Sequence, residues 1–355
     1  MNVDLNRKMA DSNKSRIAVV GCGAVAELRH LPALAARDDR EIFALVDTDE
    51  ARVRRLAAEY GAQHALTDHK DLLDLGLDGA IVATPTNLHA PMTIDLLRAG
   101  LHVLLEKPIA RSLDECDAMI AVAQEVDRVL AVAFFRRFAH QLRLAKTFID
   151  AGLLGTVKSF DIRDGYEFGW PVKTDFPFRR EAAGGGVLID LGVHVLDLVT
   201  WWFGDAESLE YWDNDRGGVE SDCLLHITMA SGGEGVIEFS RTRLLRNTAI
   251  IVGDQGTLEV DLNSSDFILS LEESRTGITG SAFSGNPATG TEQDPIDLFV
   301  AQHDDWLDAA RAGGSPAVSA MEARRSLALI VDCYARRQVL ELPWIESATL
   351  EEAVR

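Results

Sequence analysis

The chain has 355 residues, of which 47% are hydrophobic and 26% charged, and its formal net charge is -21. This length predicts two domains, and the composition is typical of folded proteins with enough apolar residues for two cores. A surface this negative repels phosphate backbones and anionic lipid, so we expect no nucleic-acid or membrane partner. The sequence shows neither a run of about 18 apolar residues nor an apolar leader, so we expect a cytoplasmic protein.

Strands and helices alternate in the first part of the chain. Buried strands are expected at residues 16–20, 41–46, 80–83, 102–105 and 129–134. Helices are expected at residues 24–37, 49–60, 90–99 and 112–126, with a kink or short break at Pro32. This alternation predicts right-handed βαβ units and a doubly wound parallel sheet of the Rossmann type. We expect a flexible tail at residues 1–15 and a first domain at residues 16–137.

The pattern changes after Arg136 and the next helix, which is expected at residues 141–151. Longer strands that alternate in polarity follow at residues 159–163, 223–229, 234–241, 248–252, 256–261 and 267–271. They predict a large, mostly antiparallel open sheet with one solvated face. Helices at residues 189–202, 295–312 and 320–339 would cover the other face, and residues 277–291 would form a long surface loop. The second domain, of α+β type, is expected at residues 138–345, with a second tail at 346–355.

The most specific local signal is Gly21-Cys-Gly-Ala-Val-Ala26, a GxGxxA run between an expected strand and an expected helix. Asp47 ends the next strand. This context predicts a dinucleotide site with the pyrophosphate at the N-terminus of the helix, although an ordinary glycine-rich turn is the alternative. The residues of the turn expected at the cofactor are Gly21, Gly23, Ala24 and Val25. A carboxylate at position 47 favours NAD over NADP because it would bind ribose hydroxyls and repel a 2′-phosphate, while Arg52 and Arg54 leave NADP open.

Two further runs lie where strands of the parallel sheet end, the edge at which such sheets bind ligands. In residues 84–91, the side chains of Thr84, Asn87 and His89 could contact the cofactor, although capping of the following helix explains them about as well. The second run is Glu106-Lys107-Pro108. A lysine there would face the nicotinamide and could help to ionise a substrate hydroxyl, whereas a lysine in a surface loop usually has no such role.

Three polar residues recur at helical spacing after the run Gly184-Gly185-Gly186: Asp190, His194 and Asp197. The residues between them are almost all apolar, so the helix is expected to be buried, where polar groups are costly unless they are paired or functional. One interpretation is a structural Asp–His pair inside the core. The other is a base, His194, with Asp190 beside it in a pocket, and three glycines that let a substrate or cofactor approach the backbone.

These motifs, in this order, resemble the Gfo/Idh/MocA family, named for glucose-fructose oxidoreductase and inositol dehydrogenase. The family pattern is GxGxxA, AxPxxxHxP, EKP and GGGxxxDxGxHxxD, and the resemblance covers about residues 16–343. It implies an N-terminal Rossmann domain and a C-terminal domain whose open sheet often joins copies of the chain, so we expect a homodimer or homotetramer. Phe135 stands where the family often has Asn, and His140 where it often has Pro. These departures leave the polarity of the substrate open.

The resemblance also implies a site that uses NAD(P) on a carbon of a sugar, inositol or related polyol. Lys107 looks like the EKP lysine that polarises the reacting oxygen, and a cis bond before Pro108 would aim it inward. His194 looks like the general acid/base, and Asp190 like the partner that holds the histidine or a substrate hydroxyl. His194 would take the alcohol proton while Lys107 stabilises the developing alkoxide, and no metal is required.

The segment 164–180 is rich in aromatic residues and leads into the glycine run. Tyr166, Trp170 and Arg179 are therefore candidate substrate contacts, because aromatic faces suit a sugar ring. The alternative is a packed loop with solvated basic ends. A phosphorylated substrate would need a local basic pocket, for which the candidates are Lys173, Arg179 and Arg180.

Two other functions remain open for a chain of this kind. An NAD-dependent glycosidase would oxidise its sugar transiently and release a product without net change of the cofactor. A non-catalytic regulator would bind a dinucleotide or sugar without turnover, and loss of Lys107 or of the Asp190–His194 pair would favour it. The sequence retains all three residues.

Overall fold

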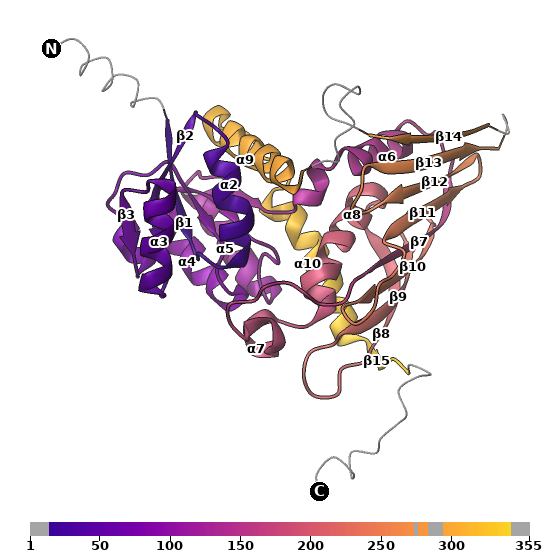
Figure 1. Cartoon of the computed structure of the whole chain (residues 1–355). Helices are drawn as coiled ribbons and strands as arrows, with labels where there is room; N and C mark the ends of the chain where they lie inside the picture. The colour runs from indigo at the N-terminus through magenta and orange to yellow at the C-terminus, as the bar shows by residue number, and fades with distance from the viewer. Residues whose placement is uncertain (1–13, 273–275, 283–293, 342–355) are drawn as a thin grey trace, which may run out of the picture.

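The computed structural model describes residues 14–272, 276–282 and 294–341. Two sheets lie side by side with helices between them (Figure 1). The first has six strands in the order β3-β2-β1-β4-β5-β6, and the second has nine in the order β14-β13-β12-β11-β7-β10-β9-β8-β15. This arrangement confirms the predicted fold class of a doubly wound parallel sheet followed by a large, mostly antiparallel one.

All strand pairs of the first sheet are parallel. Its strands are β1 (Ser15–Val20), β2 (Arg40–Val46), β3 (His64–Leu66), β4 (Gly79–Val82), β5 (His102–Leu105) and β6 (Leu130–Val132). Helices flank both faces, so β1 and β4 are continuous buried apolar runs, as both-sided coverage requires. Sequence reasoning missed β3 because three residues are too few to show a period.

The helices of the first half follow the predicted order. They are η2 (Ala26–His30), α2 (Leu31–Ala35), α3 (Glu50–Tyr60), η3 (His69–Leu72), η4 (Thr86–Leu88), α4 (His89–Arg98) and α5 (Leu113–Glu125). The expected interruption at Pro32 takes the form of a change in winding. Residues of η2 form a π-helix, and Pro32 lies in the first turn of α2, where a residue without an N–H is tolerated.

The second sheet is antiparallel except for two parallel pairs, β10 with β7 and β15 with β8. Its strands are β7 (Val157–Gly165), β8 (Ala206–Asp213), β9 (Asp222–Met229), β10 (Glu234–Ser240), β11 (Thr248–Gly253), β12 (Gly256–Asp261), β13 (Asp266–Leu271), β14 (Thr276–Ser281) and β15 (Arg337–Val339). The loop expected at 277–291 is wrong for its first residues, which form β14 at the edge of the sheet. Residues 283–291 lie outside the described part of the chain.

The helices that follow the first sheet are η5 (Phe135–Phe138), α6 (His140–Asp150), η6 (Phe176–Phe178), α7 (Arg180–Ala183), η7 (Leu188–Gly192), α8 (Val193–Phe203), α9 (Pro295–Ala312) and α10 (Ala320–Ala335). Helices α6, α8 and α10 cover the inner face of the second sheet (Figure 1). The helix expected to run to residue 339 ends at Ala335, because residues 337–339 pair with β8 as β15.

Helix α9 does not cover the second sheet as expected. It lies against α2 and η2 on the first sheet (Figure 1). Trp306 of α9 is fully buried in the first core, and a Cβ at Gly79 of β4 would lie 2.7 Å from its indole ring. An amphipathic pattern shows that a helix has a buried face but does not show which sheet buries it. The division at residues 137 and 138 stays a prediction, since the later part of the chain returns to the first sheet.

The segment Arg180–Phe203 is long and apolar enough to cross a membrane by length and composition alone. In the structure, 83% of its most apolar window is buried inside the protein. Its apolar character is therefore that of a core helix, and it carries the polar residues discussed below.

The three glycines before this helix are needed for packing inside the protein. A Cβ at Gly185 would lie 2.0 Å from the Tyr334 hydroxyl, and one at Gly186 would lie 2.0 Å from the carbonyl oxygen of Glu220. The buried Glu220 carboxylate accepts hydrogen bonds from the N–H groups of Gly186 (2.9 Å) and Leu188 (3.0 Å) and from the Tyr334 hydroxyl (2.7 Å). It thus caps the first turn, and the atoms that exclude a side chain at 185 and 186 belong to the protein rather than to a ligand.

We expect Gly186→Ala to lower the free energy of unfolding by about 1–3 kcal/mol or more, because the added methyl meets backbone that cannot rotate away. Chemical denaturation followed by circular dichroism measures the change. Gly218→Ala is the control, since no heavy atom lies within 4 Å of its added Cβ. Equal stability of the two variants would contradict the packing role.

Candidate active site

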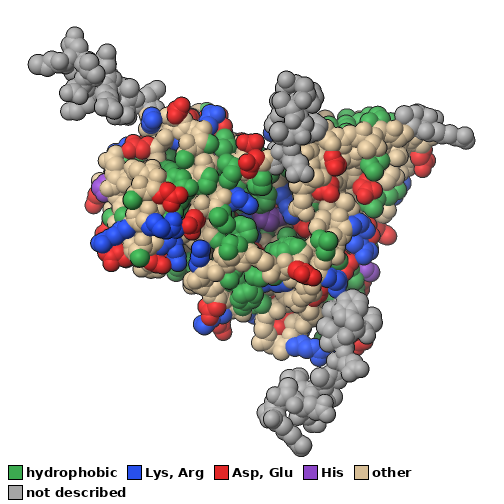
Figure 2. All heavy atoms as spheres, in the orientation of Figure 1, with side chains coloured by type: hydrophobic (Ala, Val, Ile, Leu, Met, Phe, Trp, Pro, Cys, Tyr) green, Lys and Arg blue, Asp and Glu red, His purple; other side chains and the backbone are tan. Residues whose placement is uncertain are grey.

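A pocket of about 1000 Å³ lies between the two sheets and is lined from both. Figure 2 shows hydrophobic, basic and histidine side chains gathered in the hollow at this place. The volume is at the upper end of the range for sites that hold one small molecule, so a dinucleotide and a substrate can share it. The expected site residues that line it are Gly21, Gly23, Ala24, Val25, Asp47, Thr84, Glu106, Lys107, Tyr166, Trp170, Asp190 and His194. Asn87, His89 and Arg179 do not line it.

The turn after β1 fits a dinucleotide. Gly21 has φ +92°, and a Cβ there would lie 2.5 Å from the carbonyl oxygen of Ala83, so only glycine lets β1 and β4 approach at this point. Gly23 has no heavy atom within 4 Å of its Cβ position, which leaves its pocket side open. The buried hydroxyl of Thr84 has no hydrogen-bond partner in the part of the chain that the structure describes. A helix N-terminus, an open glycine and an unpartnered hydroxyl therefore meet in one groove.

Asp47 stands at the end of β2, as expected, and it also holds the glycine turn. Its Oδ2 accepts a hydrogen bond from the Cys22 N–H at 2.8 Å, and its Oδ1 accepts one from the Asp49 N–H at 2.9 Å. Arg52 Nη1 lies 3.3 Å from Oδ2. A carboxylate has about four acceptor sites, so Asp47 keeps capacity for ribose hydroxyls. Arg54 pairs instead with the exposed Glu50.

His89 ties together the loops that follow β4 and β5. Its Nε2 lies 2.9 Å from the carbonyl oxygen of Thr84, and its Nδ1 lies 2.9 Å from that of Pro108. The side chain is 1% exposed, and burial lowers its pKa. His89 therefore holds together the two backbone segments at the floor of the pocket. Its side chain does not face the cofactor.

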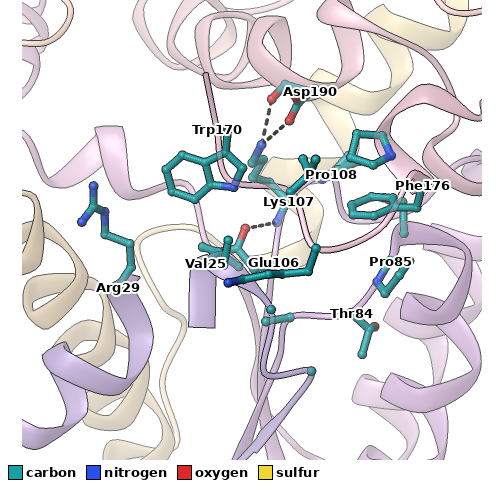
Figure 3. Close-up of a pocket in the computed structure, with 18 of the residues that line it drawn as sticks. Val25, Arg29, Thr84, Pro85, Glu106, Lys107, Pro108, Trp170, Phe176 and Asp190 are labelled. Carbon is teal, nitrogen blue, oxygen red and sulfur yellow. Dashed lines mark hydrogen bonds and ion pairs between the residues drawn. The ribbon is translucent and has the colours of Figure 1, made fainter. Parts of the chain in front are cut away.

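Lys107 and Asp190 form the centre of the pocket (Figure 3). Lys107 Nζ donates to Asp190 Oδ1 and to the Asp190 carbonyl oxygen, each at 2.9 Å. Arg241 adds a contact of 3.4 Å from Nη2 to Asp190 Oδ2. The peptide bond between Lys107 and Pro108 is cis, as the family resemblance implies. Residues 83 positions apart in the sequence thus form one ion pair.

The charges of this pair are mutually stabilised. Burial disfavours the ammonium, but Asp190 and Glu106 outweigh it and raise the pKa of Lys107 above 10.5. Burial likewise disfavours the Asp190 carboxylate, yet Lys107 and Arg241 lower its pKa below 3.8. Both groups are therefore charged at neutral pH.

His194 is held by aromatic rings. The side chain is 5% exposed, and its ring makes edge contacts with Phe134 and Phe135, with centroid distances of 5.8 and 5.1 Å. Its Nδ1 is buried and has no hydrogen-bond partner among residues 14–272, 276–282 and 294–341. Burial, followed by the positive charges of Lys107 and Arg136, lowers the pKa of His194 well below 6.5, so the ring is neutral at pH 7.

The three polar residues of this helix have different partners. Asp190 pairs with Lys107, and among the described residues no hydrogen bond joins it to His194, which does not support a structural Asp–His pair. Both side chains line the same pocket. The π-helical turn of η7 contains Asp190 and changes its rotation relative to His194. Asp197 is buried and receives two hydrogen bonds of 2.7 Å from Arg137, which is a structural ion pair.

The aromatic segment after β7 forms the outer wall. Tyr166, Trp170 and Phe176 line the pocket, and Figure 3 shows Lys107 between Trp170 and Phe176. Trp170 is 39% exposed. Lys173 Nζ lies 3.6 Å from Glu27 Oε2 on η2, which connects this wall to the dinucleotide helix.

The basic residues of the segment do not form an anion site. Besides the contact of Lys173 with Glu27, Arg179 pairs with Asp175 at the surface, and Arg180 pairs with Asp215. Each cation expected to serve a phosphorylated substrate thus has a carboxylate beside it, and the structure gives no support to that use.

Sequence reasoning missed Arg29, Arg241 and Phe299. Arg29 lines the pocket one helical turn beyond Val25 (Figure 3), and the spacing of the GxGxxA helix could have indicated it. Arg241 follows β10 and Phe299 belongs to α9. No local signal marks these two, because only the tertiary fold brings their elements to the pocket.

Two family models match the chain. Residues 15–134 match the oxidoreductase family with an NAD-binding Rossmann fold, and residues 142–259 match the GFO/IDH/MocA C-terminal domain. D-glucoside 3-dehydrogenase of Escherichia coli (strain K12) is 32% identical over 218 residues, which span 60% of this chain and 61%, less than two thirds, of that protein. Myo-inositol 2-dehydrogenase of Thermotoga maritima is 25% identical over 353 residues, 96% of this chain and 99% of that one.

Solved structures share the fold. Aldose-aldose oxidoreductase from Caulobacter crescentus superposes with a TM-score of 0.81 at 24% identity, over 91% of this chain and 97% of that one. A levoglucosan dehydrogenase, solved in complex with NADH and levoglucosan, superposes with a TM-score of 0.81 at 21% identity, over 91% of this chain and 98% of that one. These structures support the fold. The two family models confirm the resemblance indicated by the motifs: the chain is an NAD-binding oxidoreductase of the Gfo/Idh/MocA family.

Proposed function

We propose that this protein transfers a hydride between NAD(P) and a secondary alcohol or ketone of a sugar, inositol or related polyol. The observation that carries the proposal is one pocket in which a charged Lys107, its partner Asp190 and a neutral His194 lie beside a dinucleotide turn. The names of the sugar and polyol dehydrogenases among the relatives support the substrate class.

The residues divide the work as follows. Gly21–Val25 and Asp47 would hold the pyrophosphate and ribose of NAD, which supplies the hydride acceptor. An ammonium has three N–H donors, and Lys107 uses two on Asp190, so the third remains to polarise the substrate oxygen. Because Nδ1 of His194 is enclosed, its Nε2 would take the alcohol proton. In the reverse direction the same nitrogen would return a proton to the alkoxide formed from a ketone.

The wall around this centre suits a sugar. Tyr166 and Trp170 offer aromatic faces to a ring with apolar C–H groups, and we propose them as substrate contacts. We further propose that the protein works in the cytoplasm and that the outer face of the second sheet joins copies of the chain. Apolar side chains such as Val236, Ile250 and Ile268 remain partly or largely exposed on that face.

Lys107→Ala and His194→Ala should each lower kcat by about 100-fold or more, because each removes a group that acts on the reacting oxygen or its proton. A sugar and polyol panel read at the NADH absorbance band measures turnover, and fluorescence titration measures NAD binding, which should persist. Arg98→Ala, at an exposed position of α4 away from the pocket, is the control. Unchanged turnover in both site variants would overturn the assignment, whereas sugar release without net NADH would indicate the glycosidase.

Asp47→Ala should raise the Kd for NAD more than the Kd for NADP, because it removes the ribose acceptor together with the charge that repels a 2′-phosphate. Asp47→Asn retains an acceptor for the Cys22 N–H and controls for collapse of the turn. Titration of both nucleotides by protein fluorescence gives the two ratios. An equal effect on NAD and NADP would mean that Asp47 does not read the ribose.

The pH profile of alcohol oxidation should be flat over about pH 7–9, since His194 is neutral above its lowered pKa and Lys107 stays charged below its raised one. The rate should fall only below pH 6.5, as His194 gains a proton. Lys107→Met removes a positive charge that lowers the pKa of His194, so the acid limb should move to higher pH, while Lys107→Arg should leave it in place. Identical acid limbs in kcat/KM for all three proteins would show that His194 is not the titrating base.

A further inference from the structure

A line of buried side chains lies behind the catalytic loop. Glu106 Oε2 accepts the N–H of Lys107 at 3.1 Å, and Glu106 Oε1 lies 2.9 Å from Nε2 of His30. Nδ1 of His30 lies 2.9 Å from Nε2 of His303. Glu106 is 6% exposed, and neither histidine is exposed at all. None of the roles proposed above uses the two histidines.

The hydrogen bonds of this line continue from one side chain to the next. A carboxylate oxygen accepts, so Nε2 of His30 donates to Glu106 Oε1. Nδ1 of His30 and Nε2 of His303 form the next hydrogen bond. Nδ1 of His303 is a buried atom without a hydrogen-bond partner among the described residues. Burial, then His30 and Arg40, lower the pKa of His303 well below 6.5, which keeps that ring neutral.

The line joins three distant parts of the chain. His30 ends η2, the helix that starts at the dinucleotide turn, and Glu106 follows β5. His303 belongs to α9, which lies outside both segments matched by the family models. Helix α9 thus reaches the peptide of Lys107 through two imidazoles and one carboxylate.

The same helix also supports His194. The ring of Phe299 on α9 contacts the His30 ring edge-on, with 5.0 Å between the ring centroids, and stacks on the Phe135 ring, with 5.4 Å between the centroids. Phe135 in turn makes the edge contact with His194 at 5.1 Å. Lys107 lies in the loop after β5 of the first sheet, and His194 lies on α8, which covers the second sheet. His30 and α9 therefore support both residues.

We propose that His30 and His303 are positioning residues of the reaction: they keep Glu106 turned toward the N–H of Lys107, and thereby fix the ammonium relative to His194. The inference rests on the proposed function for its kinetic consequence but not for its geometry. A purely structural cluster would contribute to stability and leave the rate of each folded site unchanged. A positioning role changes that rate, because a displacement of about 1 Å can cost on the order of 100-fold.

The kinetic test compares leucine with glutamine at each histidine. The glutamine amide can donate from the place of the imidazole Nε2, whereas leucine cannot. We expect His30→Leu and His303→Leu to lower kcat on the order of 10- to 100-fold and to raise the deuterium isotope effect of a substrate labelled at the carbinol carbon. The glutamine variants should recover most of kcat, and Kd for NAD should not change.

Trp306→Leu is the matched control for lost stability, since Trp306 is a buried residue of α9 outside the line. It should lower Tm and leave kcat per folded site and the isotope effect as in the wild type. If the leucine variants at 30 and 303 behave like Trp306→Leu, the histidines are structural and the proposal is wrong.

A second readout needs no turnover. Reductive methylation with ¹³C-formaldehyde labels the lysines, and NMR titration reports the pKa of Lys107, identified by its loss in Lys107→Arg. The charged and titratable groups that act on this ammonium are Asp190 of η7, Tyr166 after β7 and Glu106 beside it. His30→Leu removes the donor that holds Glu106 Oε1 and lets the carboxyl group turn away from Lys107, so the pKa of Lys107 should fall, while His30→Gln should preserve it. An unchanged pKa of Lys107 in His30→Leu would overturn this proposal. The measurement needs no turnover, so it still tests the proposal if the wild type is inactive on every polyol and the proposed function has failed.

Discussion

The ion pair between Lys107 and Asp190 holds the pocket together. It joins the loop after β5 of the first sheet to the helix that covers the second, at 2.9 Å. Each charge has a partner, since Lys107 donates to Asp190 and Asp190 also lies 3.4 Å from Arg241. The pair also sets the state of its neighbour, because the ammonium of Lys107 helps to keep His194 neutral. A charged ammonium and a neutral imidazole therefore coexist in one small volume.

Several buried contacts keep this pair in place. Glu220, which precedes β9, caps the helix that carries Asp190. The hydroxyl of Tyr334 on α10 donates a hydrogen bond to the Glu220 carboxylate. His89 holds the loops after β4 and β5 at a constant separation. These residues touch the backbone of the site rather than its reacting groups. Such support is typical of sites in which geometry must be held closely, since each supporting group limits the motion of the one in front of it.

The order of elements in the chain was predictable because it depends on local signals. Buried parallel strands are continuous apolar runs, and the helices between them begin at caps such as Asp49 and Ser112. The missed strands β3 and β15 have three residues each, and β8 and β14 lie at or next to the edges of the second sheet. The placement of α9 was wrong because its apolar face fits either sheet, and only the complete fold shows that Trp306 fills the first core.

For the site, the dinucleotide turn, the carboxylate at position 47 and the three residues Lys107, Asp190 and His194 could be predicted from the sequence, because each belongs to a short motif with its own spacing. The partners of these side chains depend on the packing of distant elements. Asp190 pairs with Lys107 instead of His194, and His194 rests between Phe134 and Phe135. Arg241 and the line from Glu106 to His303 come from segments that share no motif with the site. Spacing along one helix fixes which residues can be neighbours there, whereas contacts between elements depend on how the two sheets pack, and no local pattern records that.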